Sequence, residues 1–442
     1  MTAGPHEVDA AASVTAADPS RTVREHLDQD VLGWWERYGA DDVHGGVRTC
    51  LGGDGEVLSE DRYTWSQGRW AWLCALVADE IDAGALTGDA AVWRARARHA
   101  ADLLAARAVL PGGSTIFCLT RDGDPVPQEG GRLDSSVFAD LFAVLGLAGA
   151  VRAGATEHLA TAERVLVAAE RAIHDRTAPT EPYPVPPGYR DLAGPMSLLH
   201  AAAELCDVGG GPEVRAVLVR SADTLVGPDG LLGVDRWWEM RPDDAAENDT
   251  LLARHVTPGH LLECLWMLVH AARTAPEIAV DPELLEHLAL RALETGWDPE
   301  HGGLLRYTDR DGGRPRGRRT GEDRYTELLE RTWDTKLWWV HAEALYATAL
   351  LAQHCGSRRL ERWYDRVRHW TLATFPAAGG AEWTQIRDRT GAPLEAVVAL
   401  PLKDPMHVAR SLALLGRIRP DATMPSSPSS PARPETDHEV PA

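Results

Sequence analysis

Two histidines of the sequence stand near expected helix starts, where their chemistry suits proton transfer. His260 follows Thr-Pro-Gly in "RHVTPGHLLECLWML", and His407 follows Asp-Pro-Met in "KDPMHVAR". Thr and Asp are good helix caps and Pro suits the first helical position, so both histidines are expected at the third helical position. The positive end of the helix dipole disfavours imidazolium there, which favours a neutral imidazole that accepts a proton. The pattern indicates an acid–base pair; the simpler alternative is that each histidine only caps or packs.

A charged residue follows each histidine by three positions, on the same expected helix face. Glu263 follows His260, and Arg410 follows His407. An acid beside His260 can bring its pKa back toward neutral pH, which suits proton transfer. His255, His260 and Glu263 could instead bind a metal, but His255 precedes the expected cap and the spacing matches no strong zinc pattern. We therefore expect no metal.

Cationic and aromatic residues in two other motifs are typical of a sugar site. In "WSQGRWAW", Arg69 is expected in the first turn of an otherwise apolar helix, where a guanidinium needs an anion or several oxygens. In "WDTKLWWVHAEALY", Lys336, Trp339 and Glu343 are expected on one helix face. Sugar rings stack on such aromatic faces, and their hydroxyls bond to the charged groups. The alternatives are a buried ion pair for Arg69 and a core tryptophan with a surface Lys/Glu pair.

A further motif, "GPMSLLHAAAEL", again places a proline at an expected helix start. Met196 would line whatever faces that end of the helix. His200 is expected on the helix body, and we do not include it in the site.

Sequence signatures of several other enzyme classes are absent. The chain has no GxSxG, no P-loop and no GxGxxG after a strand. A glycoside hydrolase that uses two carboxylates stays open, because the chain has many acids.

Helical periodicity dominates the sequence and sets how these residues are positioned. About twelve helical segments form six consecutive pairs, near 24–38, 65–82, 89–108, 134–151, 156–174, 195–206, 212–226, 258–273, 282–294, 333–353, 358–374 and 405–416. Short β-prone runs that end in Asp/Gly turns lie between them, at 44–57, 112–126, 301–314 and 381–394.

Six helical pairs with repeated excursions predict an all-α fold, an (α/α)6 barrel: a toroid of six helical hairpins with short β-hairpin excursions. An open solenoid is the competing architecture, but its usual short repeat period is absent. In the barrel the inner helices run parallel, so their N-termini gather at one rim. Residues scattered between positions 69 and 410 would then meet in one site.

Composition limits the class of protein and its partners. The net charge of −21 argues against a nucleic-acid partner. Six cysteines without a CxxC pair indicate buried thiols in a reducing cytoplasm, and no signal peptide or membrane-spanning run is found. We expect a cytoplasmic protein with no membrane partner. We expect a disordered tail over 1–22, a single catalytic domain over 23–417, and a disordered Pro/Ser-rich tail over 418–442.

The motifs occur in the order found in the N-acylglucosamine 2-epimerase family, which the sequence resembles over about residues 25–416. "WSQGRWAW", "GPMSLLHAAAEL", "RHVTPGHLLECLWML", "KLWWVHAEAL" and "KDPMHVAR" carry the resemblance. It implies an (α/α)6 barrel and deprotonation and reprotonation at C2 of an open-chain sugar, through an enediolate. The charged segment 309–331 is longer than the family pattern leads one to expect.

The resemblance also implies roles for the candidate residues. His260 and His407 would be the acid/base pair on opposite faces of C2, and Arg69 would hold the carbonyl oxygen. Glu343 and Glu263 would orient the histidines or bind hydroxyls. Lys403 and Arg410 would help shape the pocket.

By the same resemblance, the expected substrates are N-acetylglucosamine and N-acetylmannosamine. A glucose/mannose 2-epimerase and an aldose–ketose isomerase stay open, and an (α/α)6 glycoside hydrolase or a non-catalytic sugar-binding protein are more distant alternatives. No cofactor is expected for the chemistry. ATP as an allosteric activator and a homodimer follow from the resemblance alone.

Overall fold

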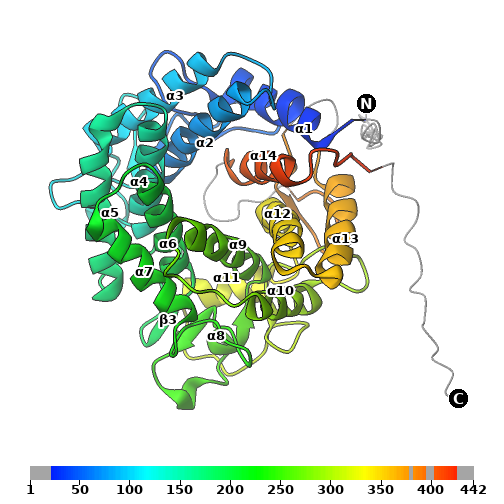
Figure 1. Ribbon diagram of the computed structural model, residues 1–442. Coiled ribbons are helices and arrows are strands. Elements are labelled where there is room, and N and C mark those ends of the chain that lie inside the picture. Colours follow the sequence, from blue (N-terminus) through cyan, green and yellow to red (C-terminus); the bar gives the residue numbers. More distant parts are fainter. Residues whose placement is uncertain (1–20, 378–381, 395–402, 426–442) are drawn as a thin grey trace, which may run out of the picture.

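The computed structural model describes residues 21–377, 382–394 and 403–425. Figure 1 shows their helices in two concentric layers around a central space. The inner layer contains α2 (Thr64–Asp82), α4 (Val137–Arg152), α6 (Ala193–Asp207), α9 (Pro258–Thr274), α12 (Trp338–Cys355) and α14 (His407–Ile418). Each packs on the next in this order, and α14 contacts α2, so the inner ring is closed. The expected (α/α)6 barrel is confirmed.

The outer layer covers the ring with one helical partner for each inner helix. It consists of α3 (Ala90–Leu103), α5 (Leu159–His174), α7 (Pro212–Val226), α10 (Pro282–Gly296), α13 (Arg358–Thr374) and a segment formed by α1 (Val23–His26) and the π-helical turns Leu27–Leu32 and Trp35–Gly39. A third π-helical turn, Leu104–Ala108, extends α3. Inner helices such as α4 are apolar around most of their surface, whereas outer helices expose a charged face.

Glycines set the tight contact between α2 and α4. A Cβ atom at Gly68 would lie 1.9 Å from the carbonyl oxygen of Phe142, and one at Gly146 would lie 2.6 Å from the Cα of Gly68. No larger residue fits this approach of two backbones. The close packing fixes Arg69, the next residue of α2, beside α4.

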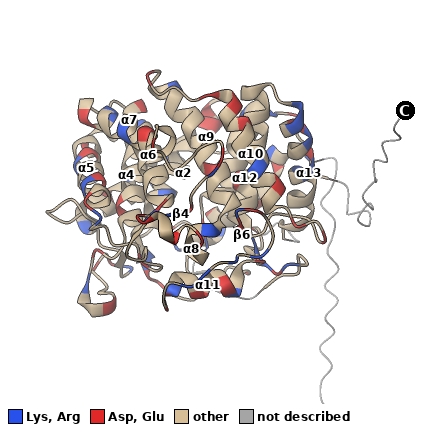
Figure 2. Cartoon of the chain, turned by 90° about the horizontal axis from the view of Figure 1, so that it is seen from below, with Lys and Arg blue, Asp and Glu red and all other residues tan. Residues whose placement is uncertain are grey.

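Four two-stranded antiparallel sheets close the helical hairpins at one end of the barrel (Figure 2). The pairs are β1 (Arg62–Tyr63) with β2 (Cys118–Leu119), β3 (Tyr189–Asp191) with β4 (Met240–Pro242), β5 (His255–Val256) with β6 (Thr308–Asp309), and β7 (Lys336–Leu337) with β8 (Ile386–Arg387). The first strand of each pair directly precedes an inner helix, and the second follows the next outer helix. The sheets therefore hold the N-termini of the inner helices.

The other two hairpins have single links of the same kind. A bridge between Ser136 and Thr180 ties the start of α4 to the segment after α5. The backbone N–H of Lys403 donates to the carbonyl of Thr49 at 2.7 Å, which ties the start of α14 to the segment after the first outer helix. The expected excursions are present, with tight local bridges such as Leu51 to Val57, but their strands pair mainly across each helical hairpin.

Short helices connect the main elements. They are α8 (Leu251–Arg254), α11 (Arg324–Thr332) and the 3-10 turns Glu129–Gly131, Thr156–His158 and Ala245–Glu247. Figure 2 places α8 and α11 at the same end of the barrel as the strands. Among the described residues, no helix has the length and apolar composition that crossing a bilayer requires.

Three expected helix positions are wrong. The helix expected from residue 333 begins at Trp338, so Lys336 lies in β7 and not on the helix face of Glu343. Arg69 is the sixth residue of α2 and lies in its second turn. His407 is the first residue of α14 and not the third, because Pro405 and Met406 precede the helix.

The ends of the described chain meet beside the outer layer. Thr22 pairs with Thr423, and the backbone N–H of Met424 donates to the carbonyl of Arg21 at 2.9 Å. Met424 is buried. Residues 418–425, which we expected in the C-terminal tail, therefore pack on the barrel, while residues 1–20 and 426–442 of the expected tails lie outside the described residues.

Candidate active site

A cavity of about 790 Å³ opens at the N-terminal ends of the inner helices. Every inner helix contributes to its lining, through Arg69 and Trp65 of α2, Phe142 of α4, Met196 and His200 of α6, His260 and Glu263 of α9, Trp339 of α12, and His407 of α14. The sequence prediction that these N-termini meet is thereby confirmed. The strand pairs at the same end hold the helices in place.

His260 is held at one ring nitrogen by a buried carboxylate. Thr257 occupies the N-cap position of α9 and Pro258 the first helical position, so His260 is the third helical residue, as expected. Its Nδ1 lies 2.8 Å from Oε1 of Glu239, which is 2% exposed. Burial lowers the pKa of His260, but the charge and hydrogen bond of Glu239 outweigh it and leave the pKa raised. The Nδ1–H donates to the carboxylate, so Nε2 is left to exchange a proton.

His407 has the same kind of partner on the other side of the site. Its Nδ1 lies 2.7 Å from Oε1 of Glu343, which is fully buried on α12. Asp404 caps the start of α14 by accepting the backbone N–H of His407 at 2.9 Å and that of Met406 at 3.1 Å. Glu343 also accepts a hydrogen bond from the indole of Trp266 at 2.8 Å. As in His260, the carboxylate that orients the ring, here that of Glu343, contacts Nδ1 of His407 and not Nε2.

Arg410 joins two carboxylates behind His407. Its Nη2 donates to Oε1 of Glu263 at 3.1 Å and makes a short hydrogen bond to Oε1 of Glu343. Burial raises the pKa of Glu343, but Arg410 and the hydrogen bond to His407 outweigh it and leave the pKa lowered. Glu263 bonds to Arg410, and Glu239 is the direct partner of His260. The charge of Glu263 also helps to raise the pKa of His260, as the sequence spacing predicted.

These carboxylates also bear on the question of a metal. Glu263, Glu343 and His407 lie close enough together to hold a cation. The guanidinium of Arg410 already bonds to both carboxylates and supplies the positive charge there. The donor set therefore fits a side-chain cation better than a metal ion.

Trp339 connects the two histidines. Its ring centre lies 5.1 Å from that of His260 and 5.9 Å from that of His407. A Cβ atom added at Gly259 would lie 2.9 Å from the Trp339 ring, so α9 and α12 approach closely here. An apolar face between two proton-transfer groups is a surface on which a sugar can lie.

Arg69 reaches the cavity from α2. Its guanidinium carbon lies 3.9 Å from the ring centre of Phe142, and its Nη1 is 3.6 Å from Oδ1 of Asp404. Burial lowers the pKa of Arg69, and Asp404 opposes this effect. Its Nε is buried without a hydrogen-bond partner among the described residues. The guanidinium thus retains donor capacity for an oxygen in the cavity.

Two further expected residues have different outcomes. Lys403 lines the cavity and donates to Oε2 of Glu382 at 3.1 Å. Lys336 is fully buried outside the cavity lining, 3.3 Å from Asp298. The structure therefore does not bring Lys336 to the site, because it precedes the helix that carries Trp339.

Several lining residues were missed by the sequence analysis. Glu239 lies one residue before β4, far in sequence from His260, and no spacing links the two. Asp191, Arg306 and Tyr325 also line the cavity. Burial raises the pKa of Asp191 to about 6. His200, which we left out, lines the cavity between the rings of Trp72 and Trp266.

A second, larger groove of about 2180 Å³ lies beside α5 and α7. It shares Glu181 and Asp191 with the central cavity but contains neither His260 nor His407. The groove is therefore a neighbour of the site and not the place of proton transfer.

The model of the N-acylglucosamine 2-epimerase family matches residues 45–405. An N-acylglucosamine 2-epimerase from Bos taurus is 28% identical, covering 94% of this chain and 96% of that protein. Its counterpart from Homo sapiens is 29% identical, covering 89% of this chain and 88% of that protein.

Solved structures share the fold. A cellobiose 2-epimerase from Bacillus thermoamylovorans has a TM-score of 0.67 at 15% identity, covering 89% of this chain and 97% of its own. A D-mannose isomerase has a TM-score of 0.66 at 16% identity, with the same coverage of both chains.

Proposed function

Because the chain belongs to the N-acylglucosamine 2-epimerase family and is a sugar 2-epimerase, we propose that it interconverts N-acetylglucosamine and N-acetylmannosamine. The N-acylglucosamine 2-epimerases from Bos taurus and Homo sapiens support this substrate class, because this chain matches them over most of their length. One observation supports the chemistry above all. Two histidines face one cavity, and a buried carboxylate holds Nδ1 of each.

The reaction needs one base and one acid at C2. In our proposal, Nε2 of one histidine removes the C2 proton of the open-chain sugar. The C–H electrons form a C1–C2 double bond and the carbonyl electrons move to its oxygen, which gives an enolate (an enediolate where C2 carries a hydroxyl instead of the N-acyl group). The other histidine, as imidazolium, returns a proton to C2 from the opposite face. His260 and His407 exchange these roles in the reverse direction. The carboxylates of Glu239 and Glu343 keep each Nδ1 protonated and each Nε2 reactive.

Negative charge develops on the sugar oxygen during the reaction. Arg69 supports an oxyanion role, because its guanidinium faces the cavity and Asp404 only partly satisfies it at 3.6 Å. Trp339 would stack on the sugar, and Met196 and Lys403 would complete the pocket. Arg410 acts behind the pocket, by holding Glu343 and thereby His407, and it also bonds to Glu263, which lines the cavity.

The alternatives differ in what the cavity must supply. An aldose–ketose isomerase would use the same histidines and deliver the proton to C1. A glycoside hydrolase would need two carboxylates committed to the glycosidic bond. Here Glu239 holds His260 and Glu263 bonds to Arg410, while Lys403 bonds to Glu382. These partnerships favour the epimerase.

The chemistry we propose uses side chains alone, with no cofactor. ATP activation, a homodimer and a cytoplasmic location stay predictions from the family resemblance and the composition.

Proton NMR in D₂O tests the proposal directly. Purified protein is incubated separately with N-acetylglucosamine, N-acetylmannosamine, glucose, mannose and cellobiose. We expect the C2 proton signal of an N-acetylhexosamine to disappear as its C2 epimer grows. A ketose product would instead identify an isomerase, and no exchange with any sugar would refute the epimerase.

Substitutions assign the bases. His260→Asn and His407→Asn should each abolish turnover. His174→Asn is the matched control, because His174 is 85% exposed on α5, away from the cavity. Equal activity of all three variants would contradict the assignment.

A further inference from the structure

Arg306 is a buried cation of the cavity wall that the proposed reaction does not use. It lies two residues before β6, and its backbone N–H donates to the carbonyl of Thr335, just before β7, at 3.0 Å. β6 pairs with the strand that leads into α9, and β7 leads into α12. Arg306 therefore sits between the starts of the helices that carry His260 and Trp339.

The guanidinium of Arg306 differs from Arg69 and Lys403 in having no acidic partner among the described residues. Arg306 is 6% exposed, yet it lines the cavity. Arg69 faces Asp404 and Lys403 bonds to Glu382. Within the described ranges, no carboxylate lies within ion-pair distance of Arg306. Its guanidinium carbon lies 4.9 Å from the ring centre of Tyr307, and its hydrogen bond to that residue opposes the rise that burial causes in the pKa of Tyr307.

The guanidinium of Arg306, which has no acidic partner among the described residues, would be stabilised by an anion bound in the cavity. Before a sugar binds, water can hydrate the guanidinium of Arg306. A bound sugar displaces that water. A buried charge is costly unless a partner compensates it. The planar fork of an arginine matches the oxygens of a carboxylate or a phosphate in pairs.

The place of Arg306 indicates which end of a sugar it would meet. In the inner ring, α9 lies opposite α2, which carries Arg69. If Arg69 holds the carbonyl end of an open-chain hexose, as proposed above, the end near C6 extends toward the side of Arg306. The wall there is completed by Tyr307 and by Tyr325 of α11.

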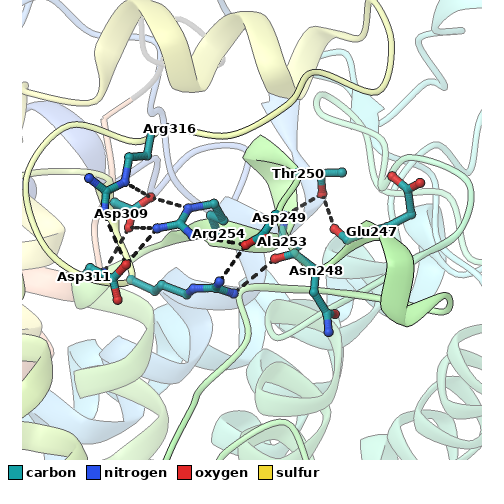
Figure 3. A network of polar contacts seen from close by, with 10 residues as sticks. Glu247, Asn248, Asp249, Thr250, Ala253, Arg254, Asp309, Asp311 and Arg316 are labelled. Atoms are coloured by element: carbon teal, nitrogen blue, oxygen red, sulfur yellow. Dashed lines mark hydrogen bonds and ion pairs between the residues drawn. The ribbon is translucent and has the colours of Figure 1, made fainter.

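Tyr325 is held firmly. Its hydroxyl lies 3.1 Å from Nε2 of His255. The segment before α11 is fixed by the network of Figure 3, in which Arg254 bonds to Asp309 and Asp311. The site around Arg306 is therefore built before any ligand binds.

We propose that Arg306 binds a carboxylate or phosphate at the C6 end of the sugar, so that the preferred substrate is an acidic N-acylhexosamine. This proposal rests on the proposed function for the orientation of the sugar.

Isothermal titration calorimetry provides a test that does not depend on turnover. The ligands are N-acetylglucosamine, its 6-phosphate, and N-acetylglucosaminuronic acid, which carries a C6 carboxylate. We expect wild-type protein to bind at least one acidic sugar about 10- to 100-fold more tightly than the neutral sugar. The tighter of the two acidic ligands identifies the anion.

Arg306→Gln should remove this preference and leave the affinity for neutral N-acetylglucosamine within about threefold. Arg37→Gln removes the same charge from an exposed site and should behave as wild type. Arg306→Lys keeps the charge without the fork and should retain only part of the preference, which keeps the test decisive if the glutamine variant does not fold.

Equal affinity of wild type for the neutral and acidic sugars would overturn the proposal, as would a preference that survives in Arg306→Gln. C2 exchange followed by NMR separates the two proposals. Exchange at C2 of neutral sugars, without tighter binding of acidic ones, would support the epimerase and refute the anion site. Tight binding of an acidic sugar that depends on Arg306, without C2 exchange, would support the anion site and refute the epimerase.

Discussion

At the scale of single residues, the two histidines differ in their electrostatic surroundings. Glu239 alone holds Nδ1 of His260, whereas Arg410 stands 3.3 Å from Nδ1 of His407, beside Glu343. Glu239 favours the imidazolium form of His260 and raises its pKa, whereas the ring of His407 meets an arginine as well as carboxylates. We infer that this asymmetry makes Glu239 the main group that prepares His260 to give a proton to the sugar.

Glu239→Gln tests this asymmetry. The substitution keeps the shape of the side chain but removes the charge that raises the pKa of His260. The pKa of His260 should fall. The part of the pH–rate profile that reflects the titration of His260 should therefore move to lower pH. The maximal rate should fall by roughly 10²-fold or more, in line with the worth of general acid–base groups.

The measurement is the rate of C2 proton exchange across pH. Glu277→Gln is the control, because Glu277 is 44% exposed and pairs with Arg215 on the surface. An unchanged profile in Glu239→Gln would contradict a role for Glu239 in setting the pKa of His260.

The sequence predicted the two histidines that line the cavity better than it predicted their partners. Proline and a capping residue near a helix start are local signals, and they identified His260 and His407. Glu239 reaches His260 from the loop before β4, a contact that depends on the pairing of β3 with β4. Lys336 was misplaced because a helical pattern cannot show that a strand pair ends the segment at Leu337.

At the scale of elements, one buried ion pair holds the long segment before α11. Arg254 forms a bidentate pair with Asp309, through Nε at 3.0 Å and Nη2 at 2.7 Å, and Asp309 is fully buried (Figure 3). Arg316 approaches the same carboxylate at 3.7 Å but is 65% exposed. The two arginines thus differ in burial within one network.

Arg254→Gln should destabilise the fold by about 3 kcal/mol or more, because it leaves the Asp309 charge buried without its main partner. Arg316→Gln should cost at most about 1 kcal/mol, as for an exposed pair. Denaturant unfolding measures both, and hydrogen exchange should show faster opening of residues 309–332 in the first variant only. Equal losses in both variants would refute the argument from burial.

Another buried acid links α4 to the excursion that follows α3. Oδ1 of Asp140 accepts the backbone N–H of Thr115 at 2.6 Å and its hydroxyl at 2.7 Å. Burial raises the pKa of Asp140 to about 7 from its usual 3.8. Between these two values, the folded state keeps the proton on Asp140 that the unfolded state has released. The contribution of Asp140 to the free energy of unfolding is therefore fully present below about pH 4 and is lost as the pH rises through 7.

Asp140→Asn should remove this pH dependence, because an amide oxygen can accept both hydrogen bonds. Between about pH 4 and pH 7, the free energy of unfolding of wild type should fall relative to that of the variant by roughly 1 kcal/mol per pH unit, and its melting temperature should fall with it. Asp122→Asn, at a residue that is 78% exposed, should run parallel to wild type. Parallel curves for the Asp140 variant would show that Asp140 stays ionised.

The sequence predicted the helices well at this scale, because amphipathic outer helices and apolar inner helices have distinct patterns. It did not predict how the excursions pair. Each β-prone run forms a tight local turn, as the Asp/Gly sequences indicate. The strand partners of the runs 112–126, 301–314 and 381–394 lie before an inner helix about fifty residues earlier, as Cys118 pairs with Tyr63. The run 44–57 instead bonds to Lys403, before α14.

At the scale of the whole molecule, the two ends of the described chain close the barrel. Arg24 donates to the carbonyl of Gly416 at 2.7 Å, and Arg368 donates to that of Thr423 at 2.7 Å. Met424 is 3% exposed. The sixth helical hairpin thus joins the first outer helix to α14, the last inner helix.

Truncation tests this closure. Removal of residues 426–442 should leave the melting temperature unchanged, because all the contacts just described remain. Removal of residues 419–442 should cost about 2 kcal/mol or more, through loss of the buried Met424 and the bridge to Thr22. Thermal unfolding measures both, and identical melting temperatures for the two truncations would show that residues 419–425 contribute nothing to closure.

The sixth hairpin also determines when a newly made molecule can first act. Synthesis proceeds from the N-terminus, so the first outer helix leaves the ribosome without its inner partner. That partner, α14, is the last helix of the described chain and carries His407. A chain that ends before α14 therefore lacks both the closing helix and the second of the two proposed bases. On our proposed mechanism, proton transfer therefore begins only once α14 has been made and has closed the ring, with no half-made enzyme acting on sugar beforehand.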